Sequence, residues 1–322
     1  MPVIEPSRFC PRFYYRNAHW QTWSPALYRR IPPLMPEREE FSTADGDFLD
    51  LDWLRTGSER LAVLLHGLEG SSRAGYIRGM AASLLEKGWD CLAMNFRGCG
   101  GRPNRLPRFY HSGETGDLRE VLAGAARDYP ILALVGFSMG GNMVLKYLGE
   151  NPATVDPRIQ AAAAFSVPCD LAASAARLGR PENRIYMRRF LRSLRAKITE
   201  KATRFPELFN TDGLYRIRTF AEFDDRYTAP VHGFRDATDY WTDSGSIRFL
   251  SAIRVPTLLI NACNDPFLPE ACFPHEVARH HPCLHFETPA QGGHVGFLPS
   301  PLARQSWAEK RTVEFLGAHS TG

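Results

Sequence analysis

The chain has 322 residues and a net charge of +4 at pH 7, and 44% of its residues are hydrophobic while 23% are charged. This length suits one large domain, or one domain with an inserted subdomain, and the composition is that of an ordinary soluble globular protein. The small net charge gives no reason to expect binding to nucleic acid.

The cysteines and the apolar runs bear on where the protein works. Seven cysteines, an odd number, lie scattered with no C-x-x-C pair, which argues against a disulfide framework and against a zinc site. The first residues lack the apolar core of a signal peptide, and no run has transmembrane length. We therefore expect a cytoplasmic protein with reduced thiols and no transmembrane segment, for which peripheral contact with a membrane remains open.

The first 36 residues are rich in proline, arginine and aromatic side chains. So many aromatic residues are unusual for a disordered tail, and we expect residues 1–36 to form an arm that packs on the body of the protein. The next segment alternates apolar and polar residues over 38–43 and 48–54, on both sides of the run Ala44-Asp45-Gly46-Asp47. This pattern predicts an antiparallel hairpin.

From Leu61 onward the pattern is that of a parallel sheet. Short apolar runs typical of buried parallel strands occupy residues 61–65, 90–94, 131–135, 160–165 and 257–260. Helical patterns lie between most of them, at 76–86, 115–127 and 141–149. This alternation predicts an α/β fold whose mostly parallel central sheet has helices on both faces. A last strand at 284–287 and a helix at about 302–316 close the chain.

One interval breaks this alternation. About ninety residues separate the strand that ends near Val167 from the strand that begins at Thr257, far more than a connecting loop needs. Helical patterns occupy much of it, at 170–178, 183–201, 213–223 and 237–243. We expect residues 169–251 to be a helical lid, inserted into a core of residues 37–168 and 252–322, that lies over the carboxyl ends of the strands, where α/β sheets bind ligands.

The expected lid is basic, with ten lysines and arginines between Arg177 and Arg204. A solvated helix face explains them most simply. Attraction to anionic head groups or to anionic acyl substrates is the functional alternative. Nucleic acid is the least favoured partner, because no binding motif accompanies the charge.

The strongest functional signal is the run Gly136-Phe137-Ser138-Met139-Gly140, which follows a predicted strand and precedes a predicted helix. This is the G-x-S-x-G nucleophile elbow in the context that the motif requires. Glycines two residues before and after Ser138 leave room for a sharp, strained turn. Ser138 is therefore the predicted nucleophile, and the N–H of Met139, at a helix N-terminus, is a predicted oxyanion donor.

A serine nucleophile needs a base and an acid, and histidine suits neutral pH. Of the ten histidines, His294 has the most suitable setting, between glycines in a loop that follows the last strand; His232 is a weaker candidate. Asp265 follows the strand at 257–260 and is the predicted acid, with Asp170 as its rival. The chain order Ser138, Asp265, His294 is that of α/β-hydrolases.

A second oxyanion donor is expected in the loop after the first parallel strand. That loop reads His66-Gly67-Leu68-Glu69-Gly70, and the N–H of Leu68 is the candidate. His66 is expected to shape the loop by hydrogen bonding and not to act as the base. The histidines lack metal-binding spacing, and the glycines at 98–101 lack the lysine of a phosphate-binding loop, so no metal and no cofactor are expected.

The chain resembles the YheT-like branch of the α/β-hydrolase superfamily over most of its length. The most specific segments are HGLEGS (66–71), NFRGCGGRPNR (95–105), YHSGETGDL (110–118), GFSMGGNMVLKYLGE (136–150), FAEFDDRYTAPVHGF (220–234), NDPFLP (264–269) and GGHVGF (292–297), and the match begins at NAHWQT (17–22). The resemblance implies a serine esterase, a lipid-acyl hydrolase or an alcohol acyltransferase whose charge-relay residues map onto Ser138, Asp265 and His294. Some eukaryotic relatives carry an N-terminal membrane anchor, which we do not expect from the first residues of this sequence.

These features predict a serine hydrolase that cleaves carboxylic esters through an acyl-enzyme on Ser138. Apolar residues of the expected lid, such as Ile185 and Phe190, favour a short or medium acyl chain, and the substrate is a small-molecule or lipid acyl ester. Transfer of the acyl group to an alcohol, or cleavage of a thioester, would use the same three side chains. A catalytically silent binding protein on the same scaffold is the third hypothesis. The YHSGET and EFDD motifs are expected to make structural or lid contacts.

Overall fold

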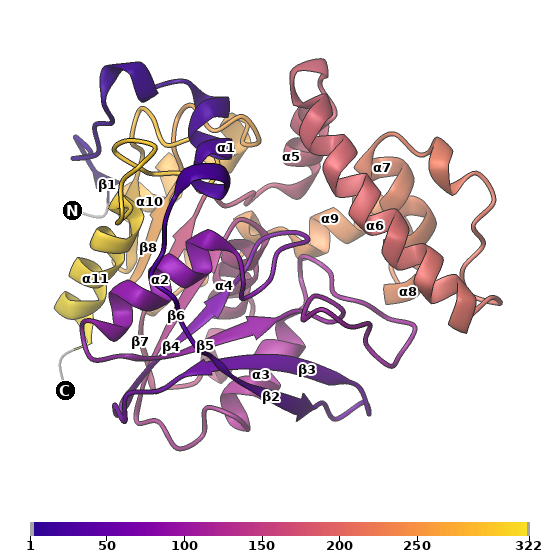
Figure 1. The fold of residues 1–322 in the computed structure, drawn as a ribbon, viewed down its shortest axis with the longest axis horizontal. Helices are drawn as coiled ribbons and strands as arrows, with labels where there is room; N and C mark the ends of the chain where they lie inside the picture. Colours follow the sequence, from indigo (N-terminus) through magenta and orange to yellow (C-terminus); the bar gives the residue numbers. More distant parts are fainter. Residues whose placement is uncertain (1–2, 321–322) are drawn as a thin grey trace.

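The computed structural model describes residues 3–320 and contains a nine-stranded sheet with the order β1-β9-β8-β7-β6-β4-β5-β3-β2 (Figure 1). The strands are β1 (Val3–Ile4), β2 (Glu37–Ser42), β3 (Phe48–Leu54), β4 (Arg60–Leu65), β5 (Asp90–Asn95), β6 (Ile131–Phe137), β7 (Ile159–Phe165), β8 (Thr257–Ile260) and β9 (Leu284–Glu287). The strands from β4 to β9 pair in parallel, so the predicted α/β fold with a mostly parallel central sheet is confirmed.

The two edges of the sheet differ. At one edge β2 and β3 form the predicted antiparallel hairpin, in the register Glu37↔Trp53, and β3 pairs antiparallel with β5. At the other edge β1 pairs in parallel with β9. β1 was not predicted, because a strand of two residues has no periodicity to detect.

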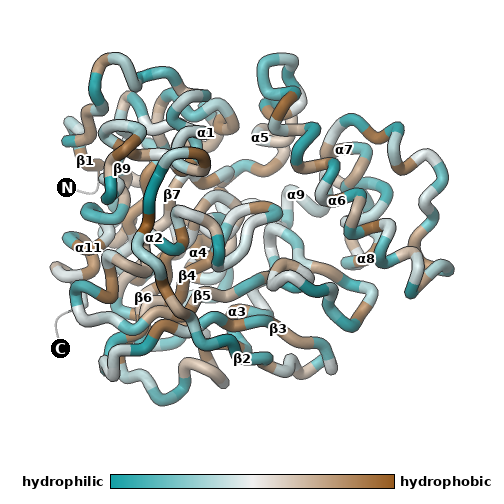
Figure 2. The backbone as a smooth tube through the Cα atoms, in the orientation of Figure 1, coloured by the Kyte–Doolittle hydropathy of each residue, from teal (hydrophilic) through white to brown (hydrophobic). Residues whose placement is uncertain are grey.

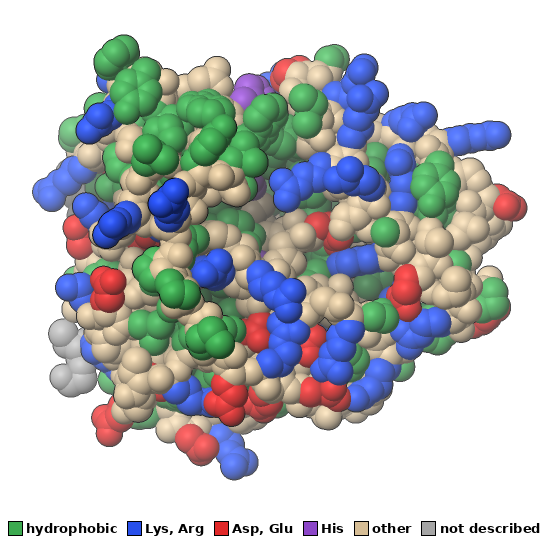
Figure 3. All heavy atoms as spheres, viewed as in Figure 1, with side chains coloured by type: hydrophobic (Ala, Val, Ile, Leu, Met, Phe, Trp, Pro, Cys, Tyr) green, Lys and Arg blue, Asp and Glu red, His purple; other side chains and the backbone are tan. Residues whose placement is uncertain are grey.

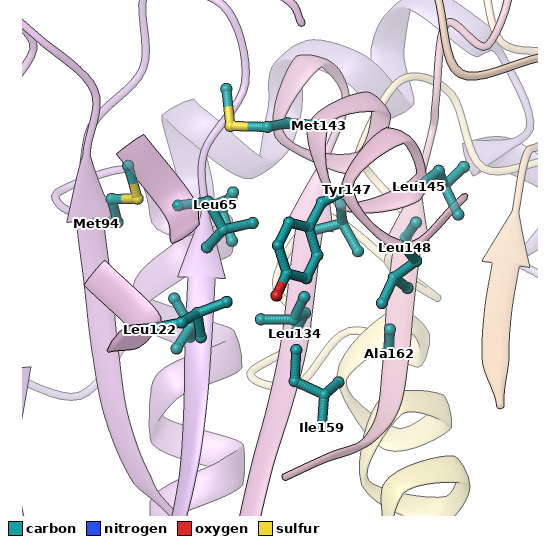
Figure 4. Packing of buried hydrophobic residues seen from close by; sticks show 14 of the residues in the cluster. Leu65, Met94, Leu122, Leu134, Met143, Leu145, Tyr147, Leu148, Ile159 and Ala162 are labelled. Carbon is teal, nitrogen blue, oxygen red and sulfur yellow. The ribbon is translucent and has the colours of Figure 1, made fainter. Parts of the chain in front are cut away.

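Helices cover both faces of the sheet (Figure 1). α2 (Gly75–Leu85) and α11 (Trp307–His319) lie on one face, whereas α3 (Thr115–Ala123), α4 (Met139–Glu150) and α10 (His275–His280) lie on the other. On the second face, Tyr147 and Leu148 of α4 pack over Leu134 of β6 and Ile159 of β7 (Figure 4). The hydrophobic residues follow the central strands, as Figure 2 shows.

Some helix ends differ from the sequence prediction. The helix predicted at 115–127 ends at Ala123, where a Cβ on Gly124 would lie 2.8 Å from the ring of Phe41. The last helix begins at Trp307 and not near residue 302, because Ser306 and Glu309 form a capping box there.

The helix predicted at 213–223 is also interrupted. A short 3-10 turn covers Leu214–Arg216, and α7 (Phe220–Phe223) begins only after Thr219, which forms a capping box with Glu222. A Thr-x-x-Glu pattern can start a helix in the middle of an apolar periodic stretch.

All elements between β7 and β8 in the described chain are helical. They are α5 (Leu171–Leu178), α6 (Arg184–Arg204), α7, a π-helix (Asp224–Thr228), α8 (Ala229–His232), α9 (Ala237–Ser244) and 3-10 turns. They form a hydrophobic cluster of their own, which also includes Phe267 and Leu268 from the loop after β8. Figure 1 shows these helices standing beside the sheet, and Figure 2 shows hydrophilic and hydrophobic positions alternating along α6.

The N-terminal segment contains α1 (Ala18–Tyr28) and lies over the body of the protein. Tyr15 is fully buried, and the ring of Phe9 lies 5.2 Å from that of Trp307 in α11. Within residues 3–320, no helix combines the length and the apolar character needed to cross a bilayer.

Candidate active site

Ser138 stands at the sharp turn between β6 and α4, with a φ of 53°. This is a strained conformation for a residue with a side chain. A Cβ on Gly136 would lie 2.4 Å from the carbonyl oxygen of Gly140, and a Cβ on Gly140 would lie 2.5 Å from the carbonyl oxygen of Leu65. Both positions therefore require glycine, for the reason that the sequence motif suggested.

The structure brings Ser138, His294 and Asp265 together. His294 Nε2 lies 2.9 Å from Ser138 Oγ, and His294 Nδ1 lies 2.8 Å from Asp265 Oδ2. A carboxylate can only accept, so Nδ1 carries the proton and Nε2 is left to accept from the serine hydroxyl. The arrangement can generate a serine nucleophile.

The carboxyl group of Asp265 is held in place and shielded from water. The residue is 3% exposed, and its Oδ1 accepts a hydrogen bond from the N–H of Phe267 at 2.9 Å. The ring of Phe267 lies over the imidazole of His294, with 4.2 Å between the ring centroids. An ion pair between Asp265 and a protonated His294 would therefore form in a site with little water, where electrostatic attraction is stronger.

The predicted oxyanion donors, Leu68 and Met139, flank Ser138. A Cβ on Gly67 would lie 3.1 Å from Ser138 Cβ, so the loop after β4 passes directly beside the serine. Met139 is the first residue of α4, where backbone N–H groups have no partner within the helix. Neither the N–H of Leu68 nor that of Met139 donates a hydrogen bond within the described chain, so both stay available to a ligand.

His66 stabilises the loop after β4, as the sequence analysis expected. Its Nδ1 donates to the carbonyl oxygen of Gly67 at 2.8 Å, and its Nε2 accepts from the N–H of Phe96 at 3.2 Å. Burial lowers the pKa of His66 to about 4, so the ring is neutral. Both ring nitrogens are occupied by backbone groups, which leaves His66 unable to act as the base.

The rival candidates lie elsewhere. Asp170 caps α5 by accepting a hydrogen bond from the N–H of Ala173 at 2.9 Å. His232 packs on the ring of His111, with 4.5 Å between the centroids, and burial lowers its pKa to about 3. Within residues 3–320, His, Cys, Asp and Glu side chains nowhere gather in a group of three or more that could hold a metal ion.

Sequence reasoning missed the contacts between α1 and the loop that carries His294. The N–H of His294 donates to Thr22 Oγ1 at 2.9 Å, and the N–H of Gly292 donates to Gln21 Oε1 at 2.9 Å. A Cβ on Gly296 would lie 2.4 Å from the carbonyl oxygen of Gln21, so the two segments touch. The only available signal was the motif NAHWQT, which gave no indication of its partner.

The YHSGET and EFDD motifs both contribute residues to the wall of the pocket that contains Ser138. The hydroxyl of Tyr110 donates to the carboxylate of Glu69, which also forms an ion pair of 2.8 Å with Lys197 of α6. Burial alone would raise the pKa of Glu69, but the charge of Lys197 and the hydrogen bonds hold it below its usual value. Glu69 follows Leu68, so this ion pair connects α6 to a predicted oxyanion donor.

Ser138 opens into a pocket with a volume of about 770 Å³, which includes space open to solvent. Most of its wall is apolar, and most of the apolar side chains come from α5, α6, α7 and Phe267. The space-filling view shows a hollow between the N-terminal part of the molecule, with many exposed apolar side chains, and the basic side chains beside it (Figure 3). A pocket of this size and character suits a small ligand with an apolar part.

Comparison with known proteins places this chain among hydrolases. A family model described as the alpha/beta hydrolase fold matches residues 62–301. YheT of Escherichia coli, whose name describes it as a candidate esterase, is 35% identical over 96% of this chain and 93% of its own length. Phospholipase ABHD3 of Mus musculus is 32% identical over 94% of this chain and 76% of its own. The predicted resemblance is therefore confirmed.

Two further similarities extend this comparison. Medium-chain fatty acid ethyl ester synthase/esterase 2 of Saccharomyces cerevisiae is 30% identical over 83% of this chain and 64% of its own. The solved structure of an esterase of Pyrococcus furiosus has a TM-score of 0.58 at 19% identity, over 91% of this chain and 96% of that one. At such low identity this last similarity shows only a common fold.

Proposed function

The chain belongs to the α/β-hydrolase family, in its YheT-like branch, and we propose that it is a serine hydrolase that cleaves carboxylic esters through an acyl-enzyme on Ser138. The observation that carries the proposal is the continuous hydrogen-bonded series from Asp265 through His294 to Ser138, with distances of 2.8 and 2.9 Å. The names of the relatives, which include esterases and a phospholipase, support an ester as the substrate.

In the proposed first step, Ser138 Oγ attacks the ester carbonyl carbon while His294 Nε2 takes the hydroxyl proton. Asp265 keeps the imidazole in the required tautomer and offsets its positive charge. The N–H groups of Leu68 and Met139 donate to the oxyanion, and each such donor is worth on the order of 10²–10³ in kcat. The C–O bond then breaks, and the alcohol leaves with the proton from His294.

In the second step, His294 removes a proton from water, and the resulting hydroxide attacks the acyl carbon. The bond to Ser138 Oγ breaks, the serine regains a proton from His294, and the carboxylic acid leaves. No metal or cofactor has a part in this sequence of steps.

The pocket favours an ester whose acyl part is short or of medium length. Its apolar walls come mainly from the helices of residues 169–251, and we assign this segment as a lid on a core of residues 37–168 and 252–322. We assign residues 1–36 as an arm that supports the loop of His294. The yeast relative named for medium-chain esters is consistent with this substrate range.

Replacement of the serine tests the proposal. Ser138→Ala should lower kcat for a p-nitrophenyl acyl ester by on the order of 10⁶-fold. A fluorophosphonate probe should label the wild-type protein at Ser138 and leave the variant unlabelled. Ser58 precedes β4, whereas Ser138 follows the parallel strand β6, so the two hydroxyls lie at opposite ends of the strands. Ser58→Ala is therefore the matched control and should keep full activity. Undiminished turnover by Ser138→Ala would refute the mechanism.

Acyl transfer to an alcohol is the second candidate function, and the name of the yeast relative, ester synthase/esterase, favours considering it. Both reactions pass through the same acyl-enzyme and differ in the acceptor. Turnover in water with added ethanol, followed by analysis of acid and ethyl ester, separates them. An ester yield well above the molar share of ethanol would indicate a transferase.

A further inference from the structure

Away from Ser138 the pocket has a second polar region, and Asp224 of the EFDD motif lies in it. The polar side chains of the pocket wall other than those near Ser138 are mainly His111, Ser112, Asp224, Thr228, Tyr240 and Trp241. They come from the loop after β5, from the π-helix and from α9. A π-helix is rare and often marks a functional site, and here its first residue carries the acid.

The polar side chains of this region differ in how many of their hydrogen-bonding positions are occupied. The hydroxyl of Tyr240 accepts from the N–H of Ser112 at 2.9 Å and donates to its Oγ at 3.0 Å, so these two residues satisfy one another. The hydroxyl of Thr228 donates to Asp224 Oδ1 at 2.6 Å, and the indole N–H of Trp241 donates to Oδ2 at 2.9 Å.

Asp224 is therefore incompletely satisfied. A carboxylate has about four acceptor positions, and protein donors occupy two of them. Within residues 3–320, no lysine, arginine or histidine forms an ion pair with it. Asp224 is partly buried in the wall of the pocket that also contains Ser138, and a carboxylate with little access to water and no cation is costly.

We propose that Asp224 determines substrate specificity by binding a hydroxyl group on the acyl chain of the ester. The inference rests on the proposed esterase function and names its substrate class: hydroxyacyl esters. The apolar walls hold the hydrocarbon part of the chain, and Asp224 replaces the water that the hydroxyl loses on entering the pocket. Without that partner, burial of the hydroxyl would be unfavourable.

The protonation of Asp224 favours a hydroxyl over other polar groups. Burial raises the pKa of Asp224 to about 7, so both forms are present near neutral pH. A hydroxyl donates to the carboxylate and accepts from the protonated acid, and it therefore binds either form. An ammonium group could bind only the carboxylate, and a carbonyl group could bind only the acid.

Matched substrates test this inference. Wild-type protein and Asp224→Leu are compared on p-nitrophenyl esters with acyl chains of roughly six to ten carbons, a range that suits a pocket of this size, each with and without a terminal hydroxyl. Within each protein, the ratio of kcat/KM for the hydroxylated and the plain ester cancels any loss of folded enzyme. The ratio should fall about tenfold to a hundredfold in Asp224→Leu, the value of a hydrogen bond to a charged group.

Trp241→Phe is the structural control, because it removes a hydrogen bond to Asp224 and leaves the carboxyl group in place. Its ratio should stay at or above that of the wild type. If Asp224→Leu does not fold, Asp224→Asn takes its place and should give a smaller fall in the same direction.

The other outcomes separate this inference from the proposed function. An unchanged ratio in the Asp224 variant would overturn the assignment of a hydroxyl while esterase activity remained. Absence of both hydrolysis and probe labelling at Ser138 would remove the proposed function, and this inference with it.

Discussion

The N–H of His294 donates a hydrogen bond to Thr22 Oγ1 at 2.9 Å, which links two residues that lie 272 positions apart in the chain. Through this contact the N-terminal helix α1 supports the loop that positions the imidazole opposite Ser138. The same hydroxyl donates to the carbonyl oxygen of Ala18 at 2.8 Å, so its orientation is fixed. The N-terminal segment thus contributes to the geometry of the candidate active site.

Thr22→Val should therefore lower kcat. Valine keeps the volume of threonine but cannot accept the hydrogen bond, and an unsatisfied N–H costs about 1–3 kcal/mol, so kcat should fall about tenfold while KM changes little. Thr22→Ser keeps the hydroxyl and should remain close to the wild type. Steady-state kinetics on a p-nitrophenyl ester give both values. A loss of activity in Thr22→Ser with none in Thr22→Val would show that the methyl group matters and not the hydrogen bond.

Gly296→Ala should destabilise the protein and reduce its activity. A Cβ at this position would lie 2.4 Å from the carbonyl oxygen of Gln21 and 2.6 Å from that of Gly292. The loop of His294 would have to move away from α1, at a cost of about 1–3 kcal/mol. Gly317→Ala is the control, because a Cβ there meets nothing within 4 Å and alanine favours the helix by about 1 kcal/mol. Compared with the wild type, urea unfolding should give a lower free energy of unfolding for Gly296→Ala and a higher one for Gly317→Ala.

The sequence predicts those features of this protein that depend on local patterns. The alternation of strand and helix predicts the sheet, and the glycines around Ser138 predict the turn, because steric crowding acts over a few residues. The chain order of Ser138, Asp265 and His294 predicted that these three side chains act together, and the structure brings them within hydrogen-bonding distance. Their catalytic roles remain predictions.

The features that the sequence did not predict depend on contacts between distant segments. β1 exists because its two residues pair with β9, and the partner of Thr22 is chosen by packing of α1 and not by a local pattern. Helix ends depended on capping side chains, as at Thr219, which starts α7 inside a predicted helix. The π-helix has only five residues, too few to show a periodicity in the sequence.

The ion pair between Glu69 and Lys197 should couple the helical segment to the loop of Leu68. Glu69 is nearly buried, whereas the side chain of Lys197 is 25% exposed. Lys197→Met leaves the carboxylate without its cation and should cost about 2–3 kcal/mol of stability, less than a fully buried pair. The activity should also fall several-fold, because Glu69 adjoins a predicted oxyanion donor.

A double-mutant cycle measures this coupling. Glu69→Gln in the Lys197→Met background removes the unpaired charge and should restore part of the stability, which gives a coupling energy of about 1–2 kcal/mol. Arg192→Met, at an exposed position of α6, is the control and should change neither the stability nor the activity. Additive effects of the two substitutions would contradict a direct interaction.

Asp224 should make stability fall as the pH rises. Burial raises its pKa from 3.8 to about 7, and the neighbouring charge of Asp225 adds to the rise, so the folded protein binds a proton that the unfolded chain has released. The stabilisation relative to the ionised state is complete below about pH 4 and is lost through about pH 7, with an upper bound of about 4 kcal/mol for a shift of this size.

The variant Asp224→Asn has no carboxyl group at this position and cannot titrate there. The difference in unfolding free energy between the wild type and Asp224→Asn should therefore move in favour of the variant by about 2 kcal/mol between roughly pH 5 and pH 8. Urea unfolding at several pH values measures this difference, and a difference that stayed constant over the range would mean that Asp224 is already ionised at pH 5.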